Sequence, residues 1–149
     1  MARHLAEKQI SVCLWAHEPE VVQAIEQRRE NVVFLPGARL PSTLTATSEL
    51  SDALEGADCV IFAVPSHVAR PVLSRVGPLL APSVPFVSAT KGIEETTLEL
   101  MTAVMQDVLP AHMRHSLMVL SGPSFASEVS QGKPTALCLA GQDAAAVKT

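Results

Sequence analysis

PFVSATKG, residues 85–92, decides the predicted fold, because an apolar run stops there at a single lysine followed by glycine. Phe86 and Val87 have the character of a buried strand, and the TKG that closes the stretch is typical of the turn at a strand's carboxyl end. In open parallel α/β sheets, ligands bind at this carboxyl edge. Lys91 is therefore the first candidate for a binding residue, although this stretch alone would also fit an ordinary surface lysine.

Five further apolar runs have the character of strands: 9–16, 44–46, 58–65, 117–120 and 135–140. Helical spacing of apolar residues separates them, in segments that follow Pro19, Ser48, Ser66, Leu98 and Ser124. Strands that alternate with helices, each strand nearly all apolar, are typical of a mostly parallel sheet with helices on both faces. The fold class predicted is α/β with six strands.

Turn-forming residues set the expected limits of these elements. Pro36 and Gly37 predict a loop over residues 31–42. Pro71 lacks a backbone donor, so the helix after Ser66 is expected to begin nearer Ala69.

Composition excludes several classes of function. The chain has 149 residues, which is the length of one domain, and it carries 11 Lys and Arg against 15 Asp and Glu. Few aromatics and no clustered basic face argue against nucleic-acid binding. No apolar run has the length of a membrane span, and the first residues, MARHLAEKQ, lack the apolar core of a signal peptide. A cytoplasmic protein is expected.

The cysteines and histidines predict no metal site. Cys13, Cys59 and Cys138 each fall within an apolar run and are expected to be buried, reduced thiols. The five histidines lack ligand spacing with acidic or cysteine partners. No cysteine has a neighbouring base that would make it a nucleophile.

Three strand ends carry unusual residues: 65–67 (PSH), 90–92 (TKG) and 121–126 (SGPSFA). In the third, glycine permits close approach of a ligand to the backbone. The amides of Ser124, Phe125 and Ala126 would point outward from the start of a helix and could bind an anion. Many strand-to-helix turns use the same residues for capping alone.

Three more motifs accompany these segments: LWAHEPE (14–20), FLPG (34–37) and VPSH (64–67). In this order, the motifs resemble those of the amino-terminal cofactor domain of bacterial-type NAD(P)-dependent glycerol-3-phosphate dehydrogenase. The resemblance covers the whole chain, so residues 1–149 are expected to form a partial NAD(P)-binding domain. It implies a Rossmann-like, doubly wound, mostly parallel sheet.

The resemblance also implies roles for particular residues. His17 is similar to the position that lines the adenosine ribose of the cofactor, and Ala126 to another cofactor contact. Lys91 is similar to the lysine that touches both cofactor and substrate. Gly122 and Ser124 are similar to positions that contact glycerol phosphate. The family often has Thr in place of Ser124, and Ser keeps the hydroxyl.

The sequence departs from the family pattern at both ends. It contains no GxGxxG, so the first strand and its glycine-rich loop are expected to be missing. The carboxyl-terminal helical domain, which supplies the lysine that acts as general acid/base, is expected to be missing too. No catalytic residue is therefore assigned, and the chain alone is expected to be inactive or nearly so, with neither NADH nor NADPH bound at ordinary concentrations.

By resemblance, the full-length protein would be an oligomeric oxidoreductase. It would interconvert dihydroxyacetone phosphate and sn-glycerol 3-phosphate with NAD or NADP, for glycerophospholipid synthesis. The choice of cofactor stays open, because His17 stands beside Glu18 where an acid alone would favour NAD. The alternatives are a related hydroxyacid or ketopantoate reductase, which SATKG and SGPSFA disfavour, and a non-catalytic dinucleotide-binding or interaction module.

Two structural expectations follow from the sheet order 3-2-1-4-5-6 of the implied fold. Without its central strand, the strand at 9–16 should either pair with 58–65 or leave a gap, and a well-paired strand between them would refute the interpretation. Lys91 and the amides near Ser124 should lie on one rim. The open edges also predict marginal stability and aggregation.

Overall fold

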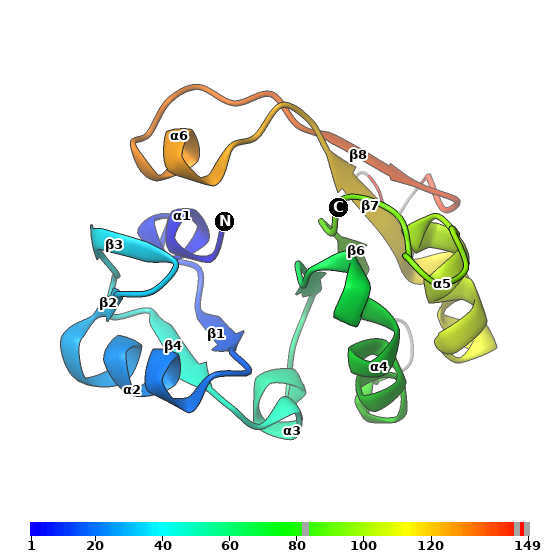
Figure 1. The fold of residues 1–149 in the computed structure, drawn as a ribbon, viewed down its shortest axis with the longest axis horizontal. Helices are drawn as coiled ribbons and strands as arrows, with labels where there is room; N and C mark the ends of the chain where they lie inside the picture. Colours follow the sequence, from blue (N-terminus) through cyan, green and yellow to red (C-terminus); the bar gives the residue numbers. More distant parts are fainter. Residues whose placement is uncertain (82–83, 145–146, 148–149) are drawn as a thin grey trace. The chain divides into compact units, whose positions relative to one another are not determined.

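The computed structural model describes residues 1–81, 84–144 and 147. They form two compact units, of which the first combines Met1–Glu55 with Pro123–Ala136 and the second combines Gly56–Gly122 with Leu137–Thr149 (Figure 1). Among the described residues, every helix is too short or too polar to cross a bilayer.

The described residues of the first unit form, in chain order, α1 (Ala2–Glu7), β1 (Val12–Trp15), α2 (Pro19–Arg28), β2 (Glu30–Asn31), β3 (Leu35–Arg39), β4 (Leu44–Thr47), α3 (Leu50–Leu54) and α6 (Ala126–Ser130). β1 and β4 pair in parallel, with Val12 opposite Leu44. Pro19 occupies the first turn of α2, where its missing N–H costs no hydrogen bond. The helix predicted to follow Pro19 is therefore confirmed, as are the strands predicted near 9–16 and 44–46.

The core of the first unit lies between α1, α2 and one face of the β1–β4 sheet. Its buried members are Ala6, Val21, Ile25, Leu40 and Leu44, and the partly buried residues packed on them include Val12, Leu14 and Ala16. Because side chains alternate along a strand, Cys13 belongs to the other face, and it is exposed. The expectation that this strand is covered on both faces is wrong for the described chain.

A hairpin replaces the loop predicted over residues 31–42. β2 and β3 pair in antiparallel fashion, with Glu30 opposite Arg39 and a bulge between Glu30 and Asn31. The amide of Gly37 donates to the Glu30 carboxylate at 2.7 Å, and Gly37 has a φ of 77° that favours glycine. Pro36 and Gly37 therefore lie within an edge strand rather than in an irregular loop.

The described residues of the second unit form β5 (Val60–Phe62), α4 (Ser66–Val76), β6 (Phe86–Ser88), α5 (Met101–Val108), β7 (Leu117–Ser121) and β8 (Cys138–Gly141). Short 3₁₀ helices lie at Gly77–Leu79 and Ala111–Ser116. The sheet order is β5-β6-β7-β8, with the first three strands parallel and β8 antiparallel to β7. With the parallel β1–β4 pair, most pairing is parallel, which confirms the predicted α/β class.

Helix α4 begins at Ser66, so the expected start near Ala69 is wrong. Pro71 lies inside the helix, and the bond it removes is the one that its N–H would give to the His67 carbonyl. His67 is exposed in the first turn, where water can satisfy that carbonyl. The buried face of α4 consists of Ala69, Leu73 and Val76 rather than the predicted valine series.

Helix α5 begins later than its apolar spacing predicts. Leu98, which was expected on the buried face, lies before the helix and is 71% exposed. Met101 and Met105 are buried, and so the prediction that these methionines fill the core is confirmed.

Of the two outcomes expected for the strands near 9–16 and 58–65, direct pairing is not found among the described residues. β1 pairs with β4 and β5 pairs with β6, in separate sheets. Among the described strands none pairs with both β1 and β5, so the strand that would refute the interpretation is not found there.

The three cysteines are exposed free thiols, which corrects the expectation that they are buried. Cys59 lies just before β5, and Cys138 begins β8 at the edge of its sheet. Both sit at strand ends, where an apolar run reaches the surface.

All three residues of β6 are buried, and Phe86 is 0% exposed. Its ring lies 5.7 Å from that of Phe62 on the neighbouring strand. Replacing Phe86 with Ala should lower the free energy of unfolding by about 3–5 kcal/mol, because it removes buried area and leaves a cavity. Urea denaturation followed by circular dichroism measures the change.

Phe34 provides the matched control, because the same substitution there removes a ring that is 64% exposed. Phe34→Ala should change the free energy of unfolding by less than about 0.5 kcal/mol. Equal losses for the two variants would contradict the assignment of Phe86 to the core.

Candidate functional site

Lys91 and Gly122 lie at the same edge of the second unit's sheet. A single register row crosses β5, β6 and β7 at Phe62, Ser88 and Val119. Lys91 follows Ser88 by three positions and Gly122 follows Val119 by three. Because the strands are parallel, both residues emerge at the carboxyl edge, where open α/β sheets bind ligands. The prediction that Lys91 follows the carboxyl end of a buried strand is confirmed.

The backbone before Lys91 is tied to the segment that follows β5. The Ala89 amide donates to the Phe62 carbonyl at 2.8 Å, and the Thr90 hydroxyl donates to the Val64 carbonyl at 2.9 Å. Lys91 itself is exposed. Within the described residues its amine has no hydrogen bond or ion pair, which leaves its charge available to a ligand.

Gly92 brings the backbone after Lys91 close to helix α4. Its φ of 96° is one that other residues rarely adopt, and a Cβ built there would lie 3.3 Å from the Ser66 hydroxyl oxygen. Ser66 is the first residue of α4. The conformation therefore favours glycine in TKG, and the Ser66 side chain leaves little room for a Cβ.

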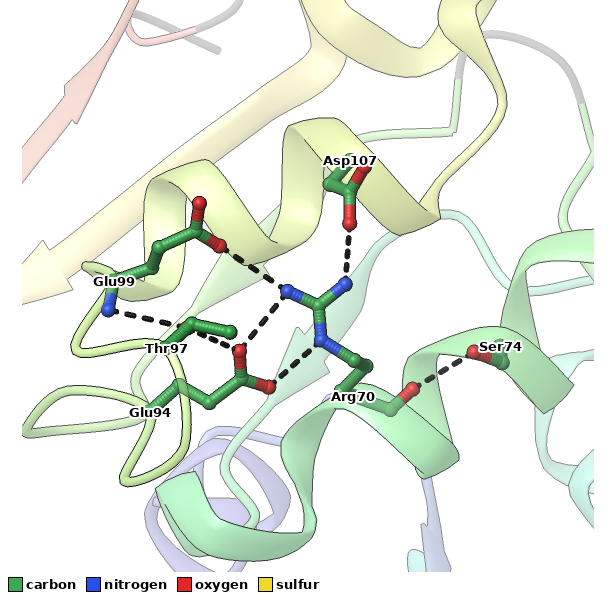
Figure 2. Close-up of polar contacts among 6 residues, drawn as sticks. All are labelled: Arg70, Ser74, Glu94, Thr97, Glu99 and Asp107. Carbon is green, nitrogen blue, oxygen red and sulfur yellow. Dashed lines mark hydrogen bonds and ion pairs between the residues drawn. The ribbon is translucent and has the colours of Figure 1, made fainter.

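Arg70 of α4 binds three carboxylates just beyond this turn (Figure 2). Its Nε donates to Glu94 Oε1 at 2.8 Å, and its Nη2 donates to Glu94 Oε2 at 3.0 Å and to Glu99 Oε2 at 3.1 Å. Its Nη1 donates to Asp107 on α5. We call these four residues the Arg70 cluster. The paired contact with Glu94 has the planar, two-bond geometry that guanidinium and carboxylate favour.

Glu94 is the buried member of the cluster, with its side chain 7% exposed against 31% for Arg70. The hydrogen bond from Arg70 lowers the pKa of the Glu94 carboxyl, and the hydroxyl of Thr97, which donates at 2.5 Å, lowers it further. The same contacts raise the pKa of Arg70, first through Glu94 and then through Asp107. Both shifts favour the charged forms of the pair.

In the first unit, His17 follows the carboxyl end of β1. Its ring is exposed and lies 6.3 Å from that of Trp15, at an angle of 50°. The Trp15 indole N–H donates to the Ser48 carbonyl at 2.9 Å, which holds the tryptophan against the segment after β4. Glu18 is the N-cap of α2 in an extended conformation.

Helix α6 begins at Ala126 and not at Ser124 as predicted. Phe125 is its N-cap, with φ −75° and ψ 130°, and its side chain is 69% exposed. The helix is only five residues long. Ser124 and Ala126 belong to the first unit and Gly122 and Lys91 to the second, so a rim shared by all four stays a prediction.

The described residues contain no group of three or more His, Cys, Asp or Glu placed to hold a metal ion. The acidic residues of the Arg70 cluster are bound to the guanidinium instead.

A sequence model of the NAD-dependent glycerol-3-phosphate dehydrogenase N-terminus matches residues 1–147. The chain belongs to this family. The glycerol-3-phosphate dehydrogenase [NAD(P)+] of Geobacter metallireducens is 46% identical over 143 residues, which are 96% of this chain and 43% of that protein. The Koribacter versatilis enzyme of the same name is 45% identical over 89% of this chain and 40% of its own length. The chain thus spans about two fifths of these relatives.

Solved glycerol-3-phosphate dehydrogenases have the same fold. The crystal structure from Coxiella burnetii matches with a TM-score of 0.87 at 31% identity, over 99% of this chain and 44% of that one. A ketopantoate reductase from Ralstonia eutropha matches with a TM-score of 0.56 at 25% identity, over 79% of this chain. These likenesses confirm the predicted Rossmann-like fold, and they favour glycerol-3-phosphate dehydrogenase over the alternative reductase.

The Arg70 cluster is the feature of this site that sequence reasoning missed. Arg70 is separated from Glu94 by 24 positions and from Asp107 by 37. The sequence offers only a weak signal, because Arg70 directly follows the fully buried Ala69 but shares its own helix face with Ser66 and Ser74.

The lowered pKa of Glu94 predicts how stability depends on pH. Unfolding returns the carboxyl pKa to its ordinary value of 4.5, so the stabilisation is complete above that pH and is lost as the pH falls through the lower folded value. At neutral pH the Glu94→Gln variant should melt several degrees below wild type. The difference should shrink below about pH 4.5, measured by circular dichroism melts down to about pH 3.

Glu95→Gln is the control for this series, because Glu95 is the exposed neighbour and its replacement makes the same change in charge. A difference between Glu94→Gln and wild type that stays constant into acid would contradict the assigned ion pair.

Proposed function

We propose that residues 1–149 act as the cofactor-binding domain of an NAD(P)-dependent glycerol-3-phosphate dehydrogenase. The protein would interconvert dihydroxyacetone phosphate and sn-glycerol 3-phosphate in the cytoplasm, as an oligomer, and supply glycerophospholipid synthesis. Membership of the family and the names of the relatives support this proposal. The observation that carries it is the exposed amine of Lys91, which has no partner among the described residues, at the carboxyl edge of a parallel sheet.

The residues present fit contact with a dinucleotide. His17, Lys91 and Ala126 are exposed, and two of them follow strands of parallel pairs. When bound, NADH or NADPH supplies the hydride. His17 would lie along the adenosine ribose, and Ala126 would contact the cofactor through its backbone at the start of α6.

Lys91 would act on the substrate by its charge. A fixed ammonium beside the phosphate binds the substrate, and beside the carbonyl oxygen it stabilises the negative charge that develops there as the carbonyl is reduced. Gly122 and Ser124 would complete the contact with the phosphorylated three-carbon compound. Gly122 has a φ of 151°, a conformation in which a side chain is strained, so the backbone rather than a side chain would meet the ligand.

No residue of this chain is proposed as the general acid/base. The exposed histidines His17 and His67 follow β1 and β5, and the resemblance assigns no proton transfer to either. The domain would therefore bind, orient and stabilise charge, while the proton donor comes from elsewhere in the protein.

A chimera tests the proposed activity. The segment of the Geobacter metallireducens enzyme that matches this chain over 143 residues is replaced by the matching segment of this chain. The purified chimera should oxidise NADH or NADPH only when dihydroxyacetone phosphate is added, as followed by the absorbance of the reduced cofactor. A folded chimera that binds NADH and does not turn over would instead support a non-catalytic dinucleotide-binding module.

Lys91→Ala in the chimera should lower kcat/KM for dihydroxyacetone phosphate by about 100-fold, as loss of a charge-stabilising group does in other enzymes. Lys133→Ala, which removes an equally exposed lysine, should stay within about twofold of the parent chimera. Equal effects of the two substitutions would contradict the role given to Lys91.

A further inference from the structure

One face of helix α4 approaches the segment after Lys91 at two points. Ser66 faces Gly92, and Arg70 binds Glu94. Ser66 and Arg70 are four residues apart, so they lie on the same side of the helix, one turn from each other. α4 therefore binds this segment at Glu94 and leaves little room beside Gly92.

We propose that Arg70 and Glu94 are positioning residues that fix Lys91 for contact with its ligand. This inference rests on the proposed role of Lys91 in binding the phosphorylated substrate. Neither residue needs to touch the ligand, because both act through the backbone between Lys91 and Glu94.

Backbone hydrogen bonds close the segment that Arg70 binds into a turn. A displacement of Glu94 would therefore move the backbone of Lys91 as well. The Glu94 amide donates to the Glu99 carbonyl at 2.9 Å, and the Leu98 amide donates to the Glu94 carbonyl at 2.9 Å. Ile93 and Leu100 form an antiparallel bridge beside them. Only Gly92 and Ile93 separate Lys91 from this closed turn, and the turn can shift little without moving the lysine.

The closed turn contains a strained residue that such contacts must maintain. Leu98 has a φ of 59° and a side chain that is 71% exposed, so its own burial does not hold it in this conformation. The hydrogen bonds to Glu94, and the bond from the Thr97 hydroxyl to the Glu94 carboxylate, hold the turn around it. Glu94 is thus the point at which the turn is both closed and attached to α4.

The cluster also keeps the charge of Lys91 available. Glu94 is the acidic residue next to Lys91 on the carboxyl side, three positions away, and a free carboxylate there could pair with the ammonium. Arg70 binds both of its oxygens and Thr97 binds one of them as well. With its carboxylate so engaged, Glu94 does not compete with an anionic ligand for Lys91.

The test uses the 149-residue chain and follows Lys91 directly. Its lysines are Lys8, Lys91, Lys133 and Lys148. Reductive methylation with ¹³C-formaldehyde gives each a separate NMR signal, and Lys91→Ala assigns the one of interest. Titration with glycerol 3-phosphate should move the Lys91 signal of wild type. Glu94→Gln and Arg70→Met should raise the Kd read from that signal about tenfold, the scale expected when a binding group is misplaced by part of an ångström.

Matched variants separate positioning from a general loss of stability. Glu95→Gln should leave Kd within about twofold of wild type. Arg70→Lys should fall between wild type and Arg70→Met, because it keeps the charge and loses the paired hydrogen bonds. In a Lys91→Ala background, with binding followed by the ³¹P signal of the ligand, Glu94→Gln should have no further effect. An equal further loss in that background would overturn the proposal.

A second readout does not depend on the ligand. Glu94→Gln should speed hydrogen exchange at the amides of residues 91–93 relative to wild type, while the amide of Val119 in β7 and all amides of Glu95→Gln stay unchanged. Unchanged exchange at 91–93 would overturn the positioning role even if Kd rose. If wild type fails to bind glycerol 3-phosphate, the exchange data alone decide whether the cluster positions the lysine, and the chimera tests the ligand of Lys91.

Discussion

Burial of β6 between two parallel neighbours is the constraint on which the candidate site depends. Phe86, Val87 and Ser88 are all buried, and the strand pairs with β5 on one side and β7 on the other. A strand enclosed in this way has one register, because a slip of one residue would reverse the side chains on its two faces. The point at which Lys91 leaves the sheet is therefore fixed by the core, and the contacts from α4 only refine it.

The sequence predicted well those elements that a short stretch of residues specifies by itself. The apolar runs located β1, β5, β6 and β7, and Pro19 located the start of α2. The β2–β3 hairpin was missed because Pro36 and Gly37 suggest a loop wherever the pairing partner is unknown. The start of α4 was misplaced because the cost of Pro71 depends on whether one carbonyl, that of His67, can reach water.

The candidate site likewise has one part that the sequence pointed to and one part that it did not. Lys91 became a candidate because SATKG places a lysine just after a buried strand, and the order of the other motifs was needed to favour it over an ordinary surface lysine. The Arg70 cluster could not, because its members come from α4, the turn before α5, and α5 itself (Figure 2). Only tertiary packing brings those segments together. The position of a charged side chain next to buried Ala69 does not show which carboxylates it will pair with.

The exposed thiols make the chain sensitive to oxidation. Cys13, Cys59 and Cys138 are all accessible, so two copies can be cross-linked through sulfur when an oxidant is present. Partial burial raises the pKa of the Cys59 thiol, so less of it is thiolate at neutral pH and it reacts more slowly than an ordinary cysteine. In air without a reductant, the chain is therefore open to covalent dimer formation through Cys13 or Cys138.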